Sequence, residues 1–178
     1  CNTGELLDYA KSFNCTTYGI EFSSMSKDIC ISKGHKIIDN IDYFNSNIDA
    51  ITAFDIIEHL YDVNKFMEKC FKALKHSGKL IVLTGNILSL PSKITKNRWW
   101  YVSYPEHIIF PSIFFLKSLN DWIINSWLPC YNGVMWMRPF IERLKSLKGL
   151  LNNKYSGYPS FCTDHILIVL EARKGNRN

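Results

Sequence analysis

The clearest pattern in the chain is the spacing of apolar and polar residues between positions 48 and 86. Apolar side chains recur there at intervals of three and four, which is the spacing of one buried helix face. This apolar set is Val63, Phe66, Met67, Cys70, Phe71 and Leu74. Two basic residues and then Gly78 follow, the usual ending of a helix. Residues 79–84 form a short apolar run, typical of a strand buried on both faces.

The region therefore predicts a strand, a helix that ends at Gly78 and a second strand. Two strands joined by one helix form a βαβ unit, in which the strands run parallel. Ligands of such sheets bind outside the carboxyl ends of the strands. We therefore expect a site near residues 53–59 and 84–86.

The rest of the chain alternates between the same two patterns, which favours an α/β domain with a mainly parallel sheet. Helices are predicted over residues 5–13, 24–32, 111–127 and 138–151, and strands over 16–22, 36–41 and 164–171. The last strand is apolar enough for a central or near-central position, and residues 155–161 are predicted to form a loop. The inward side of the helix at 111–127 is predicted to carry Phe114, Phe115, Leu119 and Trp122.

Length and composition are those of one globular domain. The chain has 178 residues, 47% of them hydrophobic, and this excludes a disordered polymer. We predict a single domain, with a cofactor-binding part at 1–86, an aromatic-rich substrate-side insertion at 87–163 and a final strand at 164–172. The net charge of +5 is scattered along the chain. It permits an anionic ligand but does not by itself indicate nucleic acid.

The cysteines and the most apolar stretch bear on location. Six cysteines occur without a C-x-x-C or metal-finger spacing, which favours free thiols in a reducing cytoplasm. Residues 108–128 are interrupted by a proline and by charged residues, so they are a poor membrane span. We predict a cytoplasmic protein without a transmembrane segment.

Three short motifs suggest a nucleotide-like ligand. A glycine turn at residues 1–7 leads into a helix, whose N-terminus favours a carboxylate or phosphate. Glu21 ends the next strand, where an acidic side chain can accept hydrogen bonds from ribose hydroxyls. The third motif is the Glu58-His59 pair after the strand that begins near residue 48.

Together these motifs resemble class I S-adenosylmethionine-dependent methyltransferases, especially the branch of the ubiquinone-biosynthesis O-methyltransferases. The resemblance covers about residues 1–116 and is carried by CNTGELL, YGIEFS, KIIDNID, DAITAFDIIEHLYD, LKHSGKLIVLTGN and WWYVSYPEHIIFPS. It implies a Rossmann-like, doubly wound and mostly parallel sheet. It also implies S-adenosylmethionine as the cofactor.

The resemblance assigns roles to particular positions. Asn2 and Gly4 would belong to the glycine loop beside the methionine moiety, and Glu21 would hold the ribose. Phe22 would pack on the adenine, with Asn40 (or Asp39) near its amino group. Ala53 and Phe54 would line the cofactor pocket.

The chain departs from the family at its beginning. The family's glycine loop normally has two more glycines and follows a first strand that ends in an acidic residue. Here residue 1 already lies in that loop, and Asn2 stands where a glycine is common. We therefore expect a fragment that lacks the first strand, which in these folds lies between the second and the fourth.

The histidines offer several chemistries. His107 is the preferred catalytic base, with His59 and Glu58 as further candidates. In small-RNA 2′-O-methyltransferases and some quinone O-methyltransferases related positions hold a divalent metal, and the matching set would be Asp55, Glu58, His59 and His107. For the Glu58-His59 pair, metal binding, substrate contact or general base, and a structural role all stay open. His35, His76 and His165 are interpreted as loop or surface residues.

All five tryptophans lie between residues 99 and 140. Aromatic residues at helical spacing usually belong to a core, although a substrate pocket is also possible. Trp99, Trp100 and Tyr101 precede the predicted helix and are candidates for a hydrophobic or sugar-stacking lid.

The sequence thus predicts methyl transfer to a small-molecule acceptor, with an oxygen as the preferred acceptor atom over nitrogen or carbon. Two alternatives stay open, namely a catalytically silent binding domain and a metal-dependent RNA 2′-O-methyltransferase. The scattered charge makes a nucleic-acid substrate the weaker prediction. The acceptor and the oligomeric state are not specified by any motif.

Overall fold

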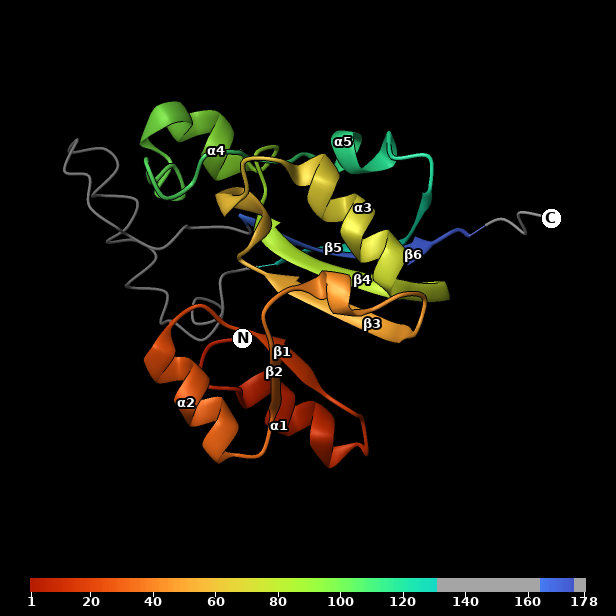
Figure 1. Ribbon diagram of the computed structural model, residues 1–178. Coiled ribbons are helices and arrows are strands. Elements are labelled where there is room, and N and C mark those ends of the chain that lie inside the picture. The colour runs from red at the N-terminus through yellow and green to blue at the C-terminus, as the bar shows by residue number, and fades with distance from the viewer. Residues whose placement is uncertain (131–163, 175–178) are drawn as a thin grey trace. The chain divides into compact units, whose positions relative to one another are not determined.

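The computed structural model describes residues 1–130 and 164–174 (Figure 1). The helix and loop predicted at 138–151 and 155–161 lie outside the described residues. The chain divides into two compact units, residues 1–45 and 46–178, which are described in turn. In the described part no helix has the length and apolar character needed to cross a membrane, and the longest one has 11 residues.

The first unit alternates helix and strand as predicted. Its elements are α1 (Glu5–Ser12), β1 (Tyr18–Ile20), α2 (Ser24–Ser32), β2 (Lys36–Ile38) and η1 (Ile41–Tyr43). Strands β1 and β2 pair in parallel, with Gly19 opposite Ile37. The hydroxyl of Ser23 caps α2 by accepting a hydrogen bond from the Ser26 N–H. Both strands are shorter than predicted, and Asn40 caps η1 immediately after β2.

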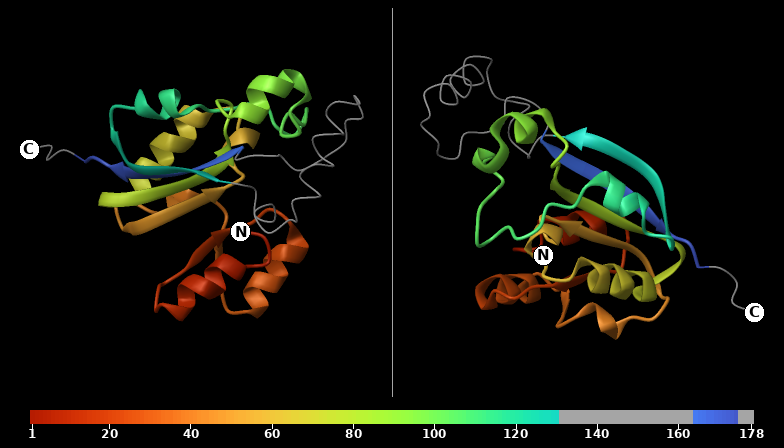
Figure 2. Two further views of the ribbon diagram at one scale, coloured as in Figure 1. Left: turned by 180° about the vertical axis from the view of Figure 1, so that it is seen from behind. Right: turned by 90° about the horizontal axis from the view of Figure 1, so that it is seen from above.

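The second unit is built on a four-stranded sheet in the order β3-β4-β6-β5. Its strands are β3 (Ile48–Phe54), β4 (Leu74–Gly85), β5 (Trp122–Cys130) and β6 (His165–Ala172). Strand β3 is parallel to β4, whereas β6 is antiparallel to both β4 and β5. Strands β3, β4 and β5 therefore run in one direction, which confirms the mostly parallel sheet. The right-hand view of Figure 2 shows the four strands in this order.

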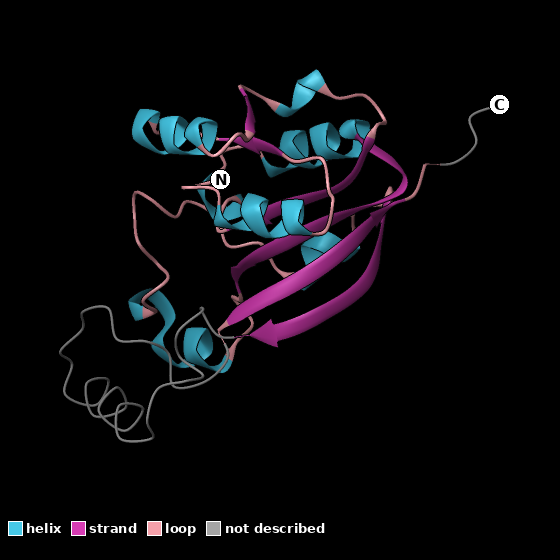
Figure 3. Cartoon of the chain, turned by 90° about the horizontal axis from the view of Figure 1, so that it is seen from below, coloured by secondary structure: helices cyan, strands magenta, loops and turns pink. Residues whose placement is uncertain are grey.

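Short helices complete the second unit. These are η2 (Ile57–His59), α3 (Val63–Ala73), α4 (Leu90–Thr95), η3 (Lys96–Arg98) and α5 (Ile113–Lys117). Figure 3 draws the helices and strands of the chain in separate colours. Strand β6 lies between β4 and β5, as its apolar sequence predicted.

Helix α3 packs against one face of this sheet (Figure 1). Asp62 caps its first turn by accepting a hydrogen bond from the Lys65 N–H at 2.9 Å. The buried side of the helix carries Met67 and Cys70, as the apolar spacing predicted. Alternate residues of the strands complete this core, namely Leu80, Val82, Ile166, Ile168 and Leu170.

The other face of the sheet is only partly buried. Ile81, Leu83, Leu167 and Val169 alternate with the core residues and keep some exposure. The prediction that residues 79–84 are buried on both faces is therefore wrong for Ile81 and Leu83. The side chains of a strand alternate between its two faces, and α3 covers only one of them.

The end of α3 also differs from the prediction. The helix ends at Ala73 and β4 begins at Leu74, before Gly78. Leu74 already has extended backbone and pairs with Ile48, so strand pairing ends the helix early. The register between β3 and β4 then shifts, so that residues 75–78 of β4 have no partner residue in β3. A β-carbon at Gly78 would lie 3.0 Å from the Lys75 carbonyl oxygen, and Gly78 does not cap the helix.

The helix predicted at residues 111–127 is wrong over most of its length. Helix α5 spans only Ile113–Lys117, and β5 follows it from Trp122. Ile123 and Ile124 are β-branched, and pairing with β6 satisfies their backbone groups. Trp122 is buried as predicted, but Phe114 is exposed.

We expect Leu170→Ala to lower the free energy of unfolding by about 2–5 kcal/mol, because the side chain is buried in an internal strand. Leu90→Ala, at an exposed leucine of α4, is the matched control and should change it little. Denaturant unfolding of both variants measures the difference. Equal losses would contradict the described core.

Candidate cofactor and active-site residues

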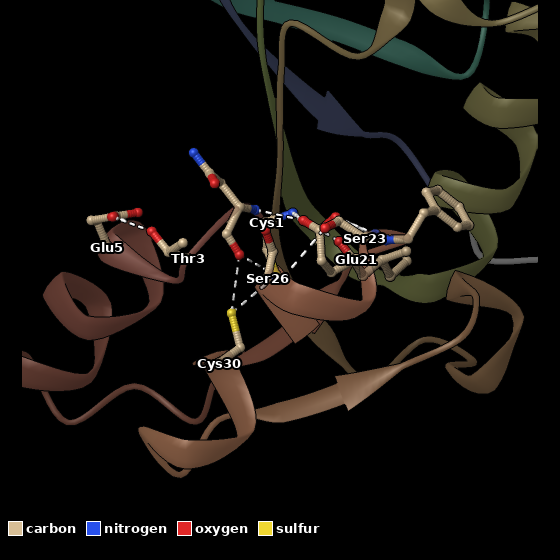
Figure 4. A network of polar contacts seen from close by, with 10 residues as sticks. Cys1, Thr3, Glu5, Glu21, Ser23, Ser26 and Cys30 are labelled. Carbon is tan, nitrogen blue, oxygen red and sulfur yellow. Dashed lines mark hydrogen bonds and ion pairs between the residues drawn. The ribbon is translucent and has the colours of Figure 1, made fainter. Parts of the chain in front are cut away.

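In the first unit, the carboxylate of Glu21 is held by four nitrogen donors (Figure 4). The N–H of Asn2 donates to Oε2 at 2.7 Å, and the amino group of Cys1 donates to it at 2.9 Å. The N–H groups of Phe22 and Ser23 each donate to Oε1 at 2.9 Å. Backbone donors thus fix the orientation of this side chain at the carboxyl end of β1.

These donors also settle the charge of Glu21. Hydrogen bonds from the Cys1 nitrogen and from the N–H groups of Ser23 and Asn2 hold the pKa of Glu21 below its usual range. The carboxylate is therefore ionised near neutral pH. An ionised carboxylate only accepts hydrogen bonds, and this is the chemistry that ribose hydroxyls require.

The turn that supplies the Asn2 N–H depends on two left-handed residues. Asn2 has φ 50° and Gly4 has φ 85°. Asparagine is one of the few residues that tolerate this region, and glycine adopts it without cost. A β-carbon at Gly4 would also lie 3.1 Å from Cδ2 of His35 and 3.2 Å from Sγ of Cys30. Glycine is therefore required here for both conformation and space.

Two further predicted cofactor residues, Phe22 and Asn40, lie in the same unit, and Phe22 joins the Glu21 cluster through its backbone N–H. The Phe22 ring is 91% exposed, so one of its faces is available for stacking. The Oδ1 atom of Asn40 accepts the Asp42 N–H at 2.7 Å, and an adenine amino group would have to share this acceptor. Asp39, the stated alternative, is paired with Lys27 at 3.3 Å.

In the second unit, Ala53 and Phe54 end β3, with Ala53 buried and Phe54 partly exposed. Asp55 follows in the left-handed region with φ 50°. Its N–H donates to the Leu83 carbonyl of the neighbouring strand at 2.9 Å. The chain thus leaves the sheet through a sharp turn, which leads directly into η2 and the Glu58-His59 pair.

Glu58 is completely buried. The hydroxyl of Thr84 donates to its Oε2 at 3.0 Å, and the hydroxyl of Tyr101 donates to its Oε1. Burial, together with the bond to Glu58, raises the pKa of Tyr101, so this hydroxyl stays protonated. Glu58 therefore joins η2, β4 and the segment after η3. The predicted catalytic contribution of this carboxylate stays a prediction.

His59 and His107 lie side by side, with ring centroids 4.7 Å apart. Nδ1 of His59 is 2.7 Å from the Glu106 carbonyl, and Nδ1 of His107 is 2.6 Å from the Tyr101 carbonyl. A carbonyl oxygen only accepts, so each Nδ1 carries its hydrogen. In the neutral rings Nε2 is then the basic atom, able to take a proton or bind a metal.

Glu58 connects the two histidines through the backbone. Its carbonyl accepts the Ile108 N–H at 2.9 Å, which holds the segment carrying His107 against η2. The His107 ring in turn packs on Tyr101, with centroids 4.3 Å apart. Structure thus brings together three of the four predicted metal residues.

Glu58, His59 and His107 offer ligand atoms that all lie within 4.8 Å of one another. Asp55, the fourth predicted ligand, is not part of this group. Two histidine nitrogens and one carboxylate could hold a transition metal. Against this, both Glu58 oxygens already accept a hydroxyl hydrogen, so the carboxylate is satisfied by protein donors.

Asp55 nevertheless lies within the electric field of this cluster. Desolvation, and then the charge of Glu58, raises the pKa of Asp55. His165, His107 and His59 act in the opposite direction. The carboxyl ends of β3 and β4 therefore gather titratable groups, as the βαβ pattern predicted for the site.

The lid predicted for Trp99, Trp100 and Tyr101 is wrong for two of the three residues. Trp99 and Tyr101 are buried, and their ring centroids lie 5.2 Å apart. The Tyr101 ring covers Gly85 so closely that a β-carbon at Gly85 would overlap it. A buried tyrosine hydroxyl needs a polar partner, and no sequence pattern indicates that Glu58 is that partner.

Two histidines interpreted as surface or loop residues are also buried. His165 pairs with Asp164 at 2.9 Å, and Asp164 also accepts the indole N–H of Trp100. His35 pairs with Asp8 of α1 at 2.8 Å. In both cases a carboxylate is the polar partner of the buried imidazole, the adjacent Asp164 for His165 and the distant Asp8 for His35. His76 is exposed, as interpreted.

We expect Tyr101→Phe to lower the free energy of unfolding by about 1–3 kcal/mol, because it leaves Oε1 of buried Glu58 without its hydroxyl donor. Tyr104→Phe is the matched control, since Tyr104 is exposed and only three residues away. Urea unfolding at neutral pH compares them. A Tyr101→Phe protein as stable as the control would show that Glu58 does not depend on this bond.

The comparisons with known proteins agree with this geometry. A family model described as a methyltransferase domain matches residues 1–122. A protein of Mycolicibacterium smegmatis, named as a probable S-adenosylmethionine-dependent methyltransferase, is 36% identical over 42 residues. That match covers 24% of this chain and 16% of the relative, so the chain matches only a small part of that protein's length.

Solved structures share the fold. A SAM dependent methyltransferase from Archaeoglobus fulgidus has a TM-score of 0.59 at 19% identity, over 96% of this chain and 82% of its own. The plantazolicin methyltransferase BpumL, in complex with a triazolic desmethylPZN analog and SAH, has a TM-score of 0.58 at 16% identity. The match covers 98% of this chain and 74% of BpumL. These structures confirm the class I methyltransferase fold. Because the family model matches well over half of its residues, the chain belongs to the methyltransferase domain family.

Proposed function

We propose that the chain binds S-adenosylmethionine and transfers its methyl group to a hydroxyl of a small molecule. Membership of the methyltransferase domain family supports the reaction class. The sulfonium of this cofactor supplies an already activated methyl group. The protein then has to align donor and acceptor in line and to receive the proton of the hydroxyl.

The observation that carries the cofactor proposal is the clamped carboxylate of Glu21. It directly follows β1, is ionised, and is oriented by the N–H groups of Asn2, Phe22 and Ser23. A fixed anionic acceptor at this position suits the two hydroxyls of a ribose. Contacts of Gly4, Phe22, Asn40, Ala53 and Phe54 with the cofactor are further predictions from the family resemblance.

The acceptor side of the proposal rests on His107 and His59. Each ring is held by a backbone carbonyl through Nδ1, which leaves Nε2 as a base. A base at this position can take the hydroxyl proton as the oxygen attacks the methyl carbon. His107 is the preferred base, and His59, whose ring packs edge-on against it, would hold its orientation.

A metal-dependent reaction on RNA 2′-hydroxyls is the second candidate, because Glu58, His59 and His107 form a possible metal site. The satisfied oxygens of Glu58 favour the metal-free reaction. Membership of the ubiquinone-biosynthesis branch and a cytoplasmic location are further predictions from the sequence. A catalytically silent binding domain is tested by the experiments that follow.

We expect Glu21→Gln to weaken the binding of S-adenosylhomocysteine about tenfold or more in the full chain, because the amide loses an ionised acceptor. Asp28→Asn, which also removes one exposed carboxylate of the same unit, is the control and should bind like the parent protein. Isothermal titration measures both. An absence of binding by the parent at millimolar cofactor would favour the silent domain.

We expect His107→Gln to lower the rate of methyl transfer about a hundredfold while S-adenosylhomocysteine affinity is retained, because only the base is lost. His76→Gln, at an exposed histidine, is the control. Transfer of labelled methyl groups to a panel of phenols, catechols and hydroquinones reports the rate.

The same assay separates a base from a metal site. If His107 acts as the base, a strong chelator leaves the rate unchanged, whereas a metal-dependent enzyme loses activity and regains it with added Mg²⁺, Mn²⁺ or Zn²⁺. Unchanged turnover in both His107→Gln and His59→Gln would contradict the general-base assignment.

A further inference from the structure

We propose that Cys1 and Cys30 are an oxidisable thiol pair, which closes to an intramolecular disulfide next to the Glu21 clamp. Their sulfur atoms lie 3.8 Å apart, although 29 positions separate the two residues in the chain. Cys30 lies in α2, and Cys1 lies in the turn that precedes α1 (Figure 4). The proximity is therefore produced by the fold of the first unit.

Glycines surround the two sulfur atoms and leave them room. A β-carbon at Gly19 would lie 2.7 Å from Sγ of Cys1, and one at Gly4 would lie 3.2 Å from Sγ of Cys30. A disulfide has an S–S distance of about 2.05 Å, so the two sulfurs have to approach by roughly 1.8 Å. Small rotations of both side chains can supply this movement.

The two thiols differ in access. The Cys1 side chain is 11% exposed, whereas Cys30 is completely buried. The S–H of Cys30 donates to the Asn2 carbonyl at 3.1 Å, which keeps its sulfur beside the residue that follows Cys1. An oxidant from solution therefore reaches Cys1 first, and Cys30 is in place to react second.

The chemistry needs a two-electron oxidant, and a peroxide is the simplest. The thiolate of Cys1 attacks one peroxide oxygen, the O–O bond breaks, and hydroxide leaves to become water, giving a sulfenic acid at Cys1. The thiolate of Cys30 then attacks the sulfur of Cys1 and displaces a second hydroxide, which also becomes water. Two thiols lose two electrons and two protons, and one peroxide is reduced to two waters.

The other cysteines of the described residues are less suited to this reaction. Cys15 is exposed, and its sulfur contacts the backbone carbonyl of Phe13. Cys70 lies on the buried side of α3, where desolvation raises the pKa of its thiol to about 12. Cys130 is half-buried, and desolvation raises the pKa of its thiol as well. Oxidation at low peroxide should therefore begin at the Cys1–Cys30 pair.

A disulfide at this position would alter the Glu21 clamp. Oε2 of Glu21 is held by the Cys1 amino group and by the adjacent Asn2 N–H. Drawing Cys1 toward α2 moves both donors, so the carboxylate loses its orientation. This consequence rests on the proposed function, in which Glu21 binds the ribose. We expect the oxidised chain to bind S-adenosylhomocysteine about fivefold or more weakly, reversibly with dithiothreitol.

The pair is tested first by mass, independently of any ligand. The folded full chain is treated with hydrogen peroxide, blocked with iodoacetamide and digested without a reductant. The expected result is one cross-linked peptide that joins Cys1 to Cys30 and has lost two hydrogen atoms. An oxidised sample in which these two cysteines are both alkylated overturns the proposal.

Single variants test the order of the steps. In Cys30→Ala the sulfenic acid should accumulate at Cys1 and be trapped by dimedone, whereas Cys1→Ser should leave Cys30 unlabelled. Cys15→Ser is the matched control and should form the cross-link like the parent. Circular dichroism melting verifies that each variant is folded. Equal dimedone labelling of Cys30 in Cys1→Ser would overturn the assignment of Cys1 as the first thiol.

Cofactor titration of the reduced and oxidised chain then tests the consequence. Weaker binding after oxidation in the parent, absent in Cys1→Ser, supports the link to Glu21. A cross-linked chain that binds the cofactor as well as the reduced one overturns that link. If the reduced chain binds no cofactor at all, the proposed function is wrong. The cross-linking experiment still shows whether Cys1 and Cys30 form a disulfide.

Discussion

The second unit depends on one buried carboxylate, that of Glu58. Transferring a carboxyl group to a protein interior is costly unless its oxygens find hydrogen-bond donors. Thr84 and Tyr101 supply these donors, from the end of β4 and from the segment after η3. The same residue accepts the Ile108 N–H through its carbonyl. Satisfying Glu58 therefore brings three distant segments to the carboxyl ends of the strands, and with them the two facing histidines.

Glu21 is also satisfied by hydrogen-bond donors, but these are mostly backbone groups and not side chains. This carboxylate stays near the surface of the first unit and is satisfied largely by backbone N–H groups. Backbone N–H groups have no side-chain rotamers, so donating these bonds costs the donors no side-chain entropy. The Glu21 side chain is therefore oriented at little entropic cost. A buried carboxylate that organises segments and a clamped carboxylate that can receive hydroxyls thus occur in one chain. The first positions catalytic candidates, and the second is the proposed cofactor ligand.

Several parts of this arrangement could be predicted from the sequence because they depend on local spacing. The apolar positions of α3 and the alternation of helices and strands follow from helix and strand periodicity. Candidate residues at the ends of β1 and β3 follow from strand ends and from the family motifs. The helix predicted at residues 111–127 failed where Trp122–Cys130 pairs with β6, because pairing with a strand more than thirty residues away overrides local spacing. The lid failed for a similar reason, since Tyr101 finds its polar partner 43 positions earlier.

The sequence by itself determined the fold class, the membership of a methyltransferase family and the residues that could carry chemistry. These features depend on periodicity and on the order of motifs, which a linear chain records directly. Only the tertiary structure decided which side chains are buried, which imidazole nitrogen is free and which residues share a hydrogen bond. Such properties depend on contacts between segments far apart in the chain. The tautomers of His59 and His107 and the meeting of Cys1 with Cys30 are therefore visible only in the folded protein.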